Sequence, residues 1–207
     1  YKIGIGMLHD IRAWLDEMPA KQLAEHLIGG VAMPELPFKP YGMMGHYLEP
    51  TDFVVTPLPN TMFTRDTTCW IENGVTINPM FWPARRNETL LTAAIYKFHP
   101  DFKNAEFHVW WGDPDVDHQR ATVEGGDVMP MGNGVVFFGM GERTTPQAVA
   151  QIVRSMFKAG AANLVVGAKM PRSRAAMHLD TVFTMCDRDI CTVFPGVVDE
   201  ITTYTAR

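Results

Sequence analysis

Acidic residues and one histidine stand just before apolar runs at three places in the chain. The motifs are Phe63-Thr64-Arg65-Asp66, Glu124-Gly125-Gly126-Asp127 and His178-Leu179-Asp180. Carboxylates gathered with an imidazole could bind a cationic group and move a proton on it. Because residues two apart on a strand face the same side, we expect His178 and Asp180 to point into one pocket. Gly125-Gly126 would permit close approaches that a side chain forbids.

Each motif also has a simpler structural interpretation. Asp66 beside an arginine is typical of a solvated pair at a strand end, and Glu124 with Asp127 around two glycines is typical of a turn. A lone histidine such as His178 is more often structural than catalytic. A zinc site is a weaker interpretation, because the cysteines lack ligand spacing and a carboxylate-rich cluster suits an organic cation equally well. The shared position of the motifs in a repeat favours the catalytic interpretation.

The elements that would position these residues repeat along the chain. Each motif leads into a strand, a tight turn and a second strand, with turns predicted at Asn73-Gly74, Asn133-Gly134 and Asp187-Arg188. Asn-Gly predicts a type I′ hairpin, in which both central residues have positive φ. The third turn lacks glycine and is a weaker signal. The repeat recurs at about 50–60 residues, which is typical of stacked supersecondary units.

A helix and a further strand follow each of the first two hairpins. The helix over 89–98 is predicted to bury one apolar face, formed by Leu91, Ala94, Ile95 and Phe98. Thr145 as N-cap and Pro146 at the first position predict a second helix, ending at Phe157 before Gly160. Its predicted buried residues are Val149, Ile152, Val153 and Met156. Strands are predicted at 107–110 and 164–167. Units of this kind stacked about an axis would form a closed, propeller-like α/β assembly.

The first part of the chain is organised differently. Apolar residues at helical spacing over 8–28 predict two helices, the second beginning at Pro19, with a stop at Gly29-Gly30. A proline-rich connection follows from Val31 to Asn60. We therefore divide the chain into residues 1–56, the end of a helical insertion with its linker, and residues 57–207, which contain the repeat.

Composition excludes several classes of protein. Of 207 residues, 46% are hydrophobic and 20% charged, a globular balance, and the net charge of -5 argues against a nucleic-acid partner. The sequence contains no apolar run of the ~20 residues that span a bilayer. Cys69, Cys186 and Cys191 match neither a disulfide framework nor a metal pair, which favours a reducing, cytoplasmic setting. The chain begins at Tyr1 and stops at Arg207 without a finishing element, so we expect an internal fragment.

Taken together, the motifs resemble those of arginine deiminase in type, order and spacing. The similar segments are Leu58 to Asp66, Trp82-Pro83-Ala84-Arg85-Arg86, Glu124-Gly125-Gly126-Asp127, Gly139-Met140-Gly141-Glu142-Arg143 and Met177 to Phe183. That family hydrolyses the guanidinium of free L-arginine to citrulline and ammonia without a metal or a cofactor. The resemblance implies a pseudo-fivefold propeller of ββαβ units, about three of which belong to this chain. The resemblance is compatible with a homo-oligomer as well as with a monomer.

The resemblance also implies a role for each site residue. Asp66 and Asp180 would hold the guanidinium, and His178, oriented by Glu124, would be the general acid and base. The remaining residues would bind or support the substrate: Asn60, Arg85 and Arg143 at the α-carboxylate, Phe63 packed on the guanidinium, and Asp127 in support. The alternative interpretation is that Arg85 and Arg143 face solvent at the starts of helices and that Phe63 is a core residue.

The family's nucleophile is a cysteine, and none of the three cysteines here matches its position. We expect Cys69, Cys186 and Cys191 to be small buried hydrophobes in strands, and the fragment alone to be inactive. The alternatives are a sister enzyme acting on methylated arginine, agmatine or an amidino-transfer donor, and a non-catalytic arginine-binding module. A purely structural repeat protein would not need ionisable residues at all three strand starts.

Overall fold

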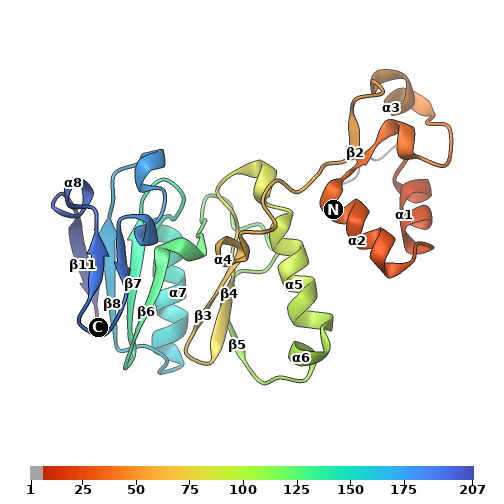
Figure 1. Ribbon diagram of the computed structural model, residues 1–207. Coiled ribbons are helices and arrows are strands. Elements are labelled where there is room, and N and C mark those ends of the chain that lie inside the picture. Colours follow the sequence, from red (N-terminus) through yellow and green to blue (C-terminus); the bar gives the residue numbers. More distant parts are fainter. Residues whose placement is uncertain (1–6) are drawn as a thin grey trace. The chain divides into compact units, whose positions relative to one another are not determined.

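The computed structural model describes residues 7–207 and divides into two compact units between Thr61 and Met62 (Figure 1). The sequence-based division after residue 56 lies slightly earlier, and the first six residues of that segment lie outside the described part of the chain. The whole is a mixed α/β fold with several small sheets. None of the helices in residues 7–207 has the length and apolar character needed to cross a membrane.

The first unit contains helices and a short two-stranded sheet. Its elements are α1 (Leu8–Asp16), α2 (Ala20–Gly29), β1 (Val31–Ala32), the 3₁₀ helix η2 (Met33–Glu35), α3 (Gly42–Tyr47) and β2 (Phe53–Val55). Both predicted helices are confirmed, and Pro19 is the N-cap of α2 rather than its first residue. The helix ends where Gly30 adopts φ 82°, and a side chain there would collide with the Val55 carbonyl oxygen. Ile11 and Leu15 pack with Val31 and Val55 in the core of the first unit.

The second unit begins with one complete ββαβ segment. Its elements are α4 (Thr64–Thr67), β3 (Thr68–Ile71), β4 (Gly74–Ile77), η3 (Pro83–Arg85), α5 (Glu88–Phe98), α6 (Pro100–Lys103) and β5 (His108–Trp111). β3 and β4 are antiparallel, and β5 joins β4 in parallel after the helical crossover. The hairpin is confirmed but its predicted turn is wrong. Glu72 and Asn73 form the turn, and Gly74 lies in β4, where a side chain would collide with Trp110.

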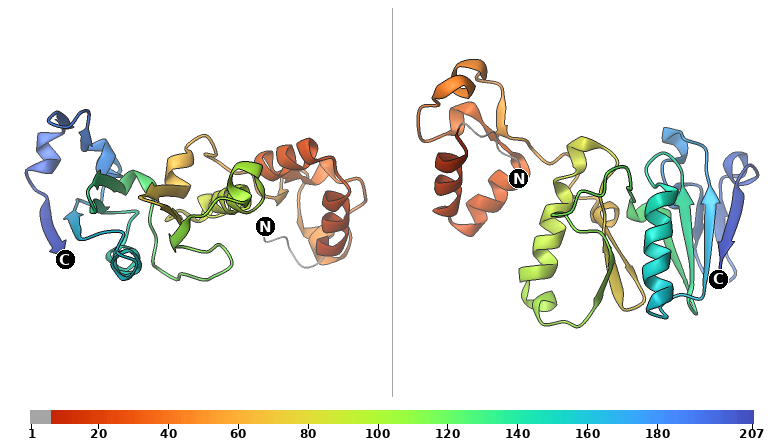
Figure 2. Two further views of the ribbon diagram at one scale, coloured as in Figure 1. Left: turned by 90° about the horizontal axis from the view of Figure 1, so that it is seen from below. Right: turned by 180° about the vertical axis from the view of Figure 1, so that it is seen from behind.

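A second ββαβ segment repeats this order. It contains η4 (Gly125–Asp127), β6 (Val128–Gly132), β7 (Val135–Met140), α7 (Pro146–Lys158) and β8 (Leu164–Lys169). The Asn133-Gly134 turn has the two predicted positive φ values, 54° and 74°. The Thr145 hydroxyl accepts from the Ala148 N–H at the start of α7, and the predicted stripe from Val149 to Met156 is buried. Figure 2 shows α7 along one face of this sheet.

The third predicted repeat departs from this pattern. Its elements are η5 (Arg174–Ala176), η6 (Leu179–Thr181), β9 (Phe183–Met185), β10 (Cys191–Val193), α8 (Pro195–Val198) and β11 (Thr202–Ala206). β9 and β10 form the predicted hairpin as a separate two-stranded sheet. β11 instead pairs antiparallel with β8, where it covers the open edge of the second sheet.

The predicted inner face of α5 is wrong. Ile95 and Phe98 are 51% and 66% exposed. The helix instead turns Thr92 and Tyr96 toward the sheet, where their hydroxyls lie 2.7 Å from the Thr67 hydroxyl and 3.0 Å from the Thr68 hydroxyl. The inward face of α5 thus carries hydroxyl groups that are hydrogen-bonded to α4 and β3.

A shared core joins the two ββαβ segments. Ile71 and Trp110 of the first pack in one cluster with Phe138 and Ile152 of the second. The starts of β3 and β6 are thereby fixed relative to each other, and the candidate site lies at those starts.

Candidate active site

The predicted site residues lie on short helical turns rather than on strands. Asp66 lies in α4, Asp127 in η4 and Asp180 in η6, each just before the hairpin that follows. His178 is the N-cap of η6, and its carbonyl accepts from the Thr181 N–H at 3.2 Å. The expectation that His178 and Asp180 lie two apart on a strand, with both side chains on one side of it, is therefore wrong. His178 is 5% exposed, whereas Asp180 is exposed.

Polar contacts bind the three turns together. The Arg65 guanidinium donates to the Gly125 carbonyl at 3.0 Å, which ties α4 to η4. The Asp127 carboxylate accepts from the Leu179 N–H at 2.8 Å, which ties η4 to η6. Its other oxygen accepts from the Thr144 hydroxyl. Segments distant in sequence are thus held at one point, with Asp127 as their buried support.

The two glycines of the second motif make this approach possible. A Cβ on Gly125 would lie 1.9 Å from the Arg65 carbonyl oxygen. A Cβ on Gly126 would lie 2.5 Å from Nδ1 of His178, so the imidazole packs directly on its backbone. The close approaches expected from the sequence are present at both positions.

Glu124 is the centre of the charged cluster. It is fully buried, and its Oε2 lies 2.8 Å from His178 Nε2 and 3.0 Å from Arg143 Nη1. Burial raises the pKa of Glu124, but the hydrogen bonds and charges of His178 and Arg143 outweigh it, so the pKa is lowered. Burial lowers the pKa of His178, but the hydrogen bond to Glu124 and the surrounding carboxylates raise it overall. The pair therefore favours imidazolium and carboxylate.

Asp66 lies beside this pair. Its Oδ1 is 3.9 Å from His178 Nδ1, and its Oδ2 accepts from Arg85 Nη1 at 2.7 Å. Burial raises the pKa of Asp180. The negative charge of Asp66 raises this pKa further, whereas the charge of His178 lowers it. The structure thus brings Asp66, Glu124 and His178 together, with Asp180 close enough for its charge to be felt.

Glu88 is a site residue that the sequence interpretation missed. Its buried carboxylate accepts from Arg85 Nη2 at 2.8 Å and from Arg85 Nε at 3.1 Å. Burial lowers the pKa of Arg85, while the hydrogen bonds to Glu88 and Asp66 raise it above its ordinary value. The signal in the sequence was the Arg-to-Glu spacing of three at a helix start, which places both side chains on one face.

Two buried polar atoms of the cluster have no hydrogen-bond partner within residues 7–207. They are Oε1 of Glu124, an acceptor, and Nε of Arg143, a donor. Burying such groups unsatisfied costs about 1–3 kcal/mol each, so they are expected to meet a ligand or water.

Two predicted residues lie at the edge of this geometry. Phe63 is the N-cap of the helix carrying Asp66 and is 55% exposed, so it is not the core residue of the alternative interpretation. Asn60 belongs to the first unit, and its role stays a prediction from the sequence. Arg85 and Arg143 are both buried, so they are not solvent-facing helix entries.

The cluster has a composition that could also hold a metal. Asp66, Glu124 and His178 offer ligand atoms within 4.8 Å of one another. However, Arg85 and Arg143 already donate to the two carboxylates. A divalent ion there would face two guanidinium groups, so the surroundings suit hydrogen-bond donors better than a metal ion.

The three cysteines lie in the described part of the chain, and each is a free thiol. Cys69 is 1% exposed with its sulfur 3.0 Å from the Thr76 hydroxyl, and burial raises its pKa to about 11. The prediction of a buried hydrophobe is confirmed for Cys69. It is wrong for Cys186 and Cys191, which are exposed because their hairpin forms a separate two-stranded sheet.

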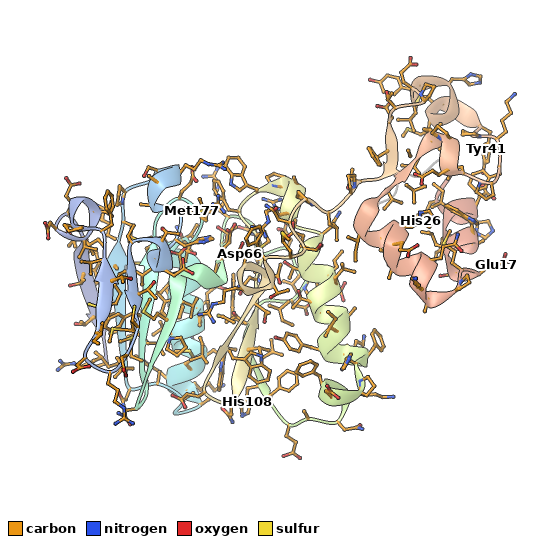
Figure 3. All side chains as sticks on the ribbon, viewed as in Figure 1. Glu17, His26, Tyr41, Asp66, His108 and Met177 are labelled. Atoms are coloured by element: carbon orange, nitrogen blue, oxygen red, sulfur yellow. The ribbon has the colours of Figure 1, made fainter. Side chains whose placement is uncertain are left out.

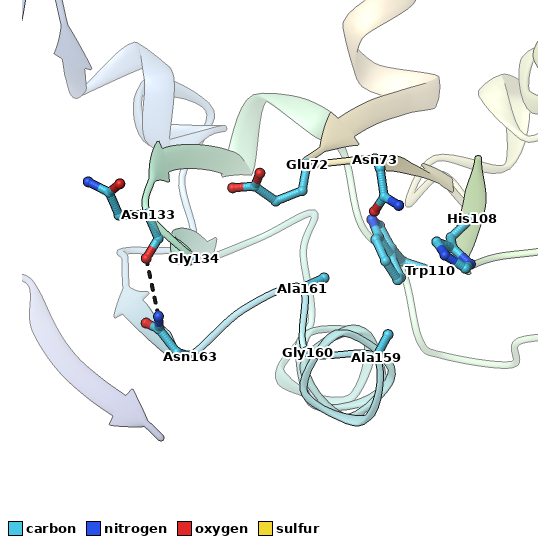
Figure 4. Close-up of a pocket in the computed structure, with 10 residues that line it drawn as sticks. All are labelled: Glu72, Asn73, His108, Trp110, Asn133, Gly134, Ala159, Gly160, Ala161 and Asn163. Atoms are coloured by element: carbon cyan, nitrogen blue, oxygen red, sulfur yellow. Dashed lines mark hydrogen bonds between the residues drawn. The ribbon is translucent and has the colours of Figure 1, made fainter. Parts of the chain in front are cut away.

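A pocket of about 630 Å³ lies away from this cluster (Figure 4). Glu72, Trp110, Asn133 and Gly160 line it, at the hairpin turns and the end of α7. Figure 3 shows Asp66 and Met177 toward one end of the strands and His108, another lining residue, toward the opposite end. We take the cluster, rather than this pocket, as the candidate active site, because the cluster holds the buried ionisable groups.

The support given by Asp127 predicts a pH dependence of stability. Burial raises the pKa of Asp127 to about 7, against hydrogen bonds from Thr144 and Leu179 that lower it. At pH values between 3.8, the ordinary pKa of the group, and about 7, Asp127 carries a proton in the folded state but not in the unfolded state. Its contribution to stability is therefore complete below about pH 4 and is lost, by a few kcal/mol, as the pH rises through about 7.

Asp127→Asn isolates this contribution, because asparagine has the same shape but does not titrate. We expect the decline of the unfolding free energy between about pH 4 and pH 7 to become shallower in the variant. Urea unfolding at several pH values measures the slope. An unchanged slope would mean that Asp127 is ionised throughout this interval.

Comparisons with known proteins show what this chain is similar to. A family model described as arginine deiminase matches residues 2–207. Among solved structures, the dimethylarginine dimethylaminohydrolase of Pseudomonas aeruginosa complexed with citrulline is 20% identical, over 66% of this chain and 47% of that chain, with a TM-score of 0.48. The amidinotransferase SxtG of Microseira wollei is 15% identical, over 72% and 45%, with a TM-score of 0.45. This chain thus spans about half the length of these two proteins.

Proposed function

The chain belongs to the arginine deiminase family, and from that premise we propose that it binds free L-arginine for hydrolysis to citrulline and ammonia. The observation that carries the proposal is the cluster around Glu124. It joins an imidazole and an arginine to one carboxylate oxygen, and it leaves one buried acceptor and one buried donor unsatisfied. Free L-arginine supplies both a donor-rich cation and an anionic carboxylate.

The guanidinium would be bound by Asp66 and Asp180. Two carboxylates match the planar set of N–H donors on a guanidinium, and their charge keeps the group cationic and its carbon electrophilic. Phe63, at the start of the helix carrying Asp66, would pack against its flat face. The unsatisfied Glu124 Oε1 offers a further acceptor.

His178 would be the general acid and base. Its raised pKa and its 2.8 Å hydrogen bond to Glu124 favour the imidazolium, which can protonate departing ammonia. In the proposed sequence a thiolate attacks the guanidinium carbon, and ammonia leaves with the proton from His178. The neutral imidazole then takes a proton from water, which attacks the amidino-thioether and releases citrulline and the thiolate.

The α-carboxylate would be bound by Arg85 and Arg143. The support for Arg143 is that its Nε is buried without a hydrogen-bond partner among the described residues and has only a 3.9 Å ion-pair contact with Glu142 Oε2. An α-carboxylate there would explain a requirement for free arginine. Asp127 would be a positioning residue that acts through the turn carrying His178.

The nucleophile would be a cysteine other than Cys69, Cys186 and Cys191. Cys69 is buried with a raised pKa, which disfavours the reactive thiolate. The proposal also includes two features of the fold: the pseudo-fivefold ββαβ propeller and the division into residues 1–56 and 57–207. It further includes a reducing, cytoplasmic location and a reaction without a metal cofactor. The two ββαβ segments support the propeller part of this proposal.

Calorimetry and a citrulline assay on the 207-residue chain test the proposal. We expect L-arginine to bind without sustained formation of citrulline, because binding and acid-base groups are present but the nucleophile is not. Citrulline at many turnovers per chain would contradict the assignment of the nucleophile. Absence of L-arginine binding would contradict the proposed function.

A further inference from the structure

The pocket of about 630 Å³ lies between the two ββαβ segments, at the end of the strands away from the candidate active site (Figure 4). Glu72, His108 and Trp110 of the first segment form one wall. Asn163 and residues 159–161 of the second segment form the other. Its volume lies within the range of about 300–1,000 Å³ that is typical of small-molecule sites.

Both walls of the pocket are held in place by contacts within their own segments. Trp110 Nε1 donates to the Ile71 carbonyl at 2.9 Å, and the His108 ring stacks on Trp110 with centroids 5.0 Å apart. On the other wall, Asn163 Nδ2 donates to the Asn133 carbonyl at 3.2 Å. The shared core fixes the two segments relative to each other, so the pocket is preformed.

The charge of the lining favours a cation. The ten lining residues, all between positions 72 and 163, include the carboxylate of Glu72 but no lysine or arginine. Residues 159–161 follow the carboxyl end of α7, where the aligned peptide dipoles leave partial negative charge. Lys158, the last residue of α7, is exposed and does not line the pocket.

The backbone of Glu72 also sets this residue apart. Its φ of 50° lies in the left-handed region, which glycine and asparagine adopt more readily than glutamate. Figure 4 shows the Glu72 side chain reaching from the first hairpin turn toward the second. A carboxylate therefore lies over the pocket at a position where local backbone preference favours a residue without one.

We infer that this pocket binds a small organic cation of the alkyl diamine class. One ammonium group would pair with Glu72 and the other would lie among the side-chain amides and the end of α7. The alkyl chain would pack against the aromatic wall and the methyl groups of Ala159 and Ala161. The inference is independent of the proposed function.

Two other ligand classes fit the pocket less well. A divalent metal ion needs several oxygen ligands close together, and a single carboxylate in a pocket of this size does not supply them. An amino acid or another ligand with a carboxylate would bring a negative charge to Glu72, with no lysine or arginine in the lining to compensate it.

Titration of the ¹⁵N-labelled 207-residue chain with putrescine, a four-carbon diamine, tests the inference. At about pH 8 both amines are charged and imidazoles are ordinarily neutral. We expect saturable shifts of the backbone amide signals of Asn73, Gly134 and Gly160. γ-Aminobutyrate, in which a carboxylate replaces one ammonium group, should bind at least about tenfold more weakly.

Two variants change the charge of the pocket in different ways. Glu72→Gln removes the carboxylate at nearly constant size, and Ala159→Lys brings an ammonium group to the opposite wall. Each should weaken putrescine binding about tenfold. Glu200→Gln is the matched control, since Glu200 is exposed and does not line the pocket, and it should change the affinity by no more than about twofold.

Three results would overturn the inference. They are the absence of saturable shifts around the pocket, equal binding of putrescine and γ-aminobutyrate, and wild-type affinity in Glu72→Gln and Ala159→Lys. The dispersion of the amide signals shows whether each variant is folded. Because Ala159 is exposed at the end of α7, its variant retains the test if Glu72→Gln disturbs the turn.

Discussion

Asp66→Asn is expected to weaken binding of L-arginine about 100-fold, since at least one charge-assisted hydrogen bond and the neutralising charge are lost. The Asp66 carboxylate lies 3.9 Å from His178 and pairs with a buried guanidinium at 2.7 Å, so its charge acts where solvent screening is weak. Asparagine keeps the size of the side chain but offers one acceptor and no charge. Calorimetry gives the ratio of dissociation constants.

The control is Asp199→Asn at an exposed position at the end of α8. It removes the same charge from the chain and should leave L-arginine affinity within about twofold, because exposed charges are screened. Near-equal binding by Asp66→Asn and wild type would contradict guanidinium recognition by Asp66. Urea unfolding of each variant shows whether a loss of binding reflects a loss of fold.

Gly125→Ala is expected to lower the free energy of unfolding by about 3 kcal/mol, at the upper end for overpacking of a close contact. The added carbon would lie 1.9 Å from the Arg65 carbonyl oxygen, which belongs to the backbone of α4 and cannot turn away as a side chain can. Relief requires the separation of α4 from η4, and with it the loss of the Arg65 hydrogen bond to Gly125. Urea unfolding measures the change.

Gly126→Ala should act more on the site than on stability. The added carbon would lie 2.5 Å from Nδ1 of His178, so the imidazole must move away from its 2.8 Å contact with Glu124.

The control for Gly125→Ala is Gly196→Ala, where the atom nearest to the added carbon, on Phe194, lies 3.6 Å away. That variant should change stability by no more than about 0.5 kcal/mol. Wild-type stability in Gly125→Ala would show that α4 and η4 do not approach this closely.

The sequence alone determined features whose cause is local. Asn133-Gly134 formed its predicted turn because both residues tolerate positive φ. The Thr145 cap and the stripe from Val149 to Met156 followed from capping and helical spacing. The repeated order of hairpin, helix and strand was also predictable, because each element has its own local signal.

Tertiary structure decided features that depend on a partner distant in sequence. Gly74 lies in β4, paired with Ile71 and packed against Trp110, so the turn is displaced by one residue from the Asn-Gly signal. The buried face of α5 follows hydrogen bonds from Thr92 and Tyr96 to α4 and β3 rather than the apolar stripe. In both cases a contact made only in the folded chain overrides a local preference.

The same distinction applies to the site. Residue types and order were enough to predict that Asp66, Glu124 and His178 lie close together, whereas the roles of these residues and of Asp180 stay predictions. Which oxygen meets which nitrogen was decided by the helical turns before the strands and by the pairing of Arg85 with both Glu88 and Asp66. Buried charges must be compensated in place, and the compensating group is set by packing in three dimensions rather than by spacing along the chain.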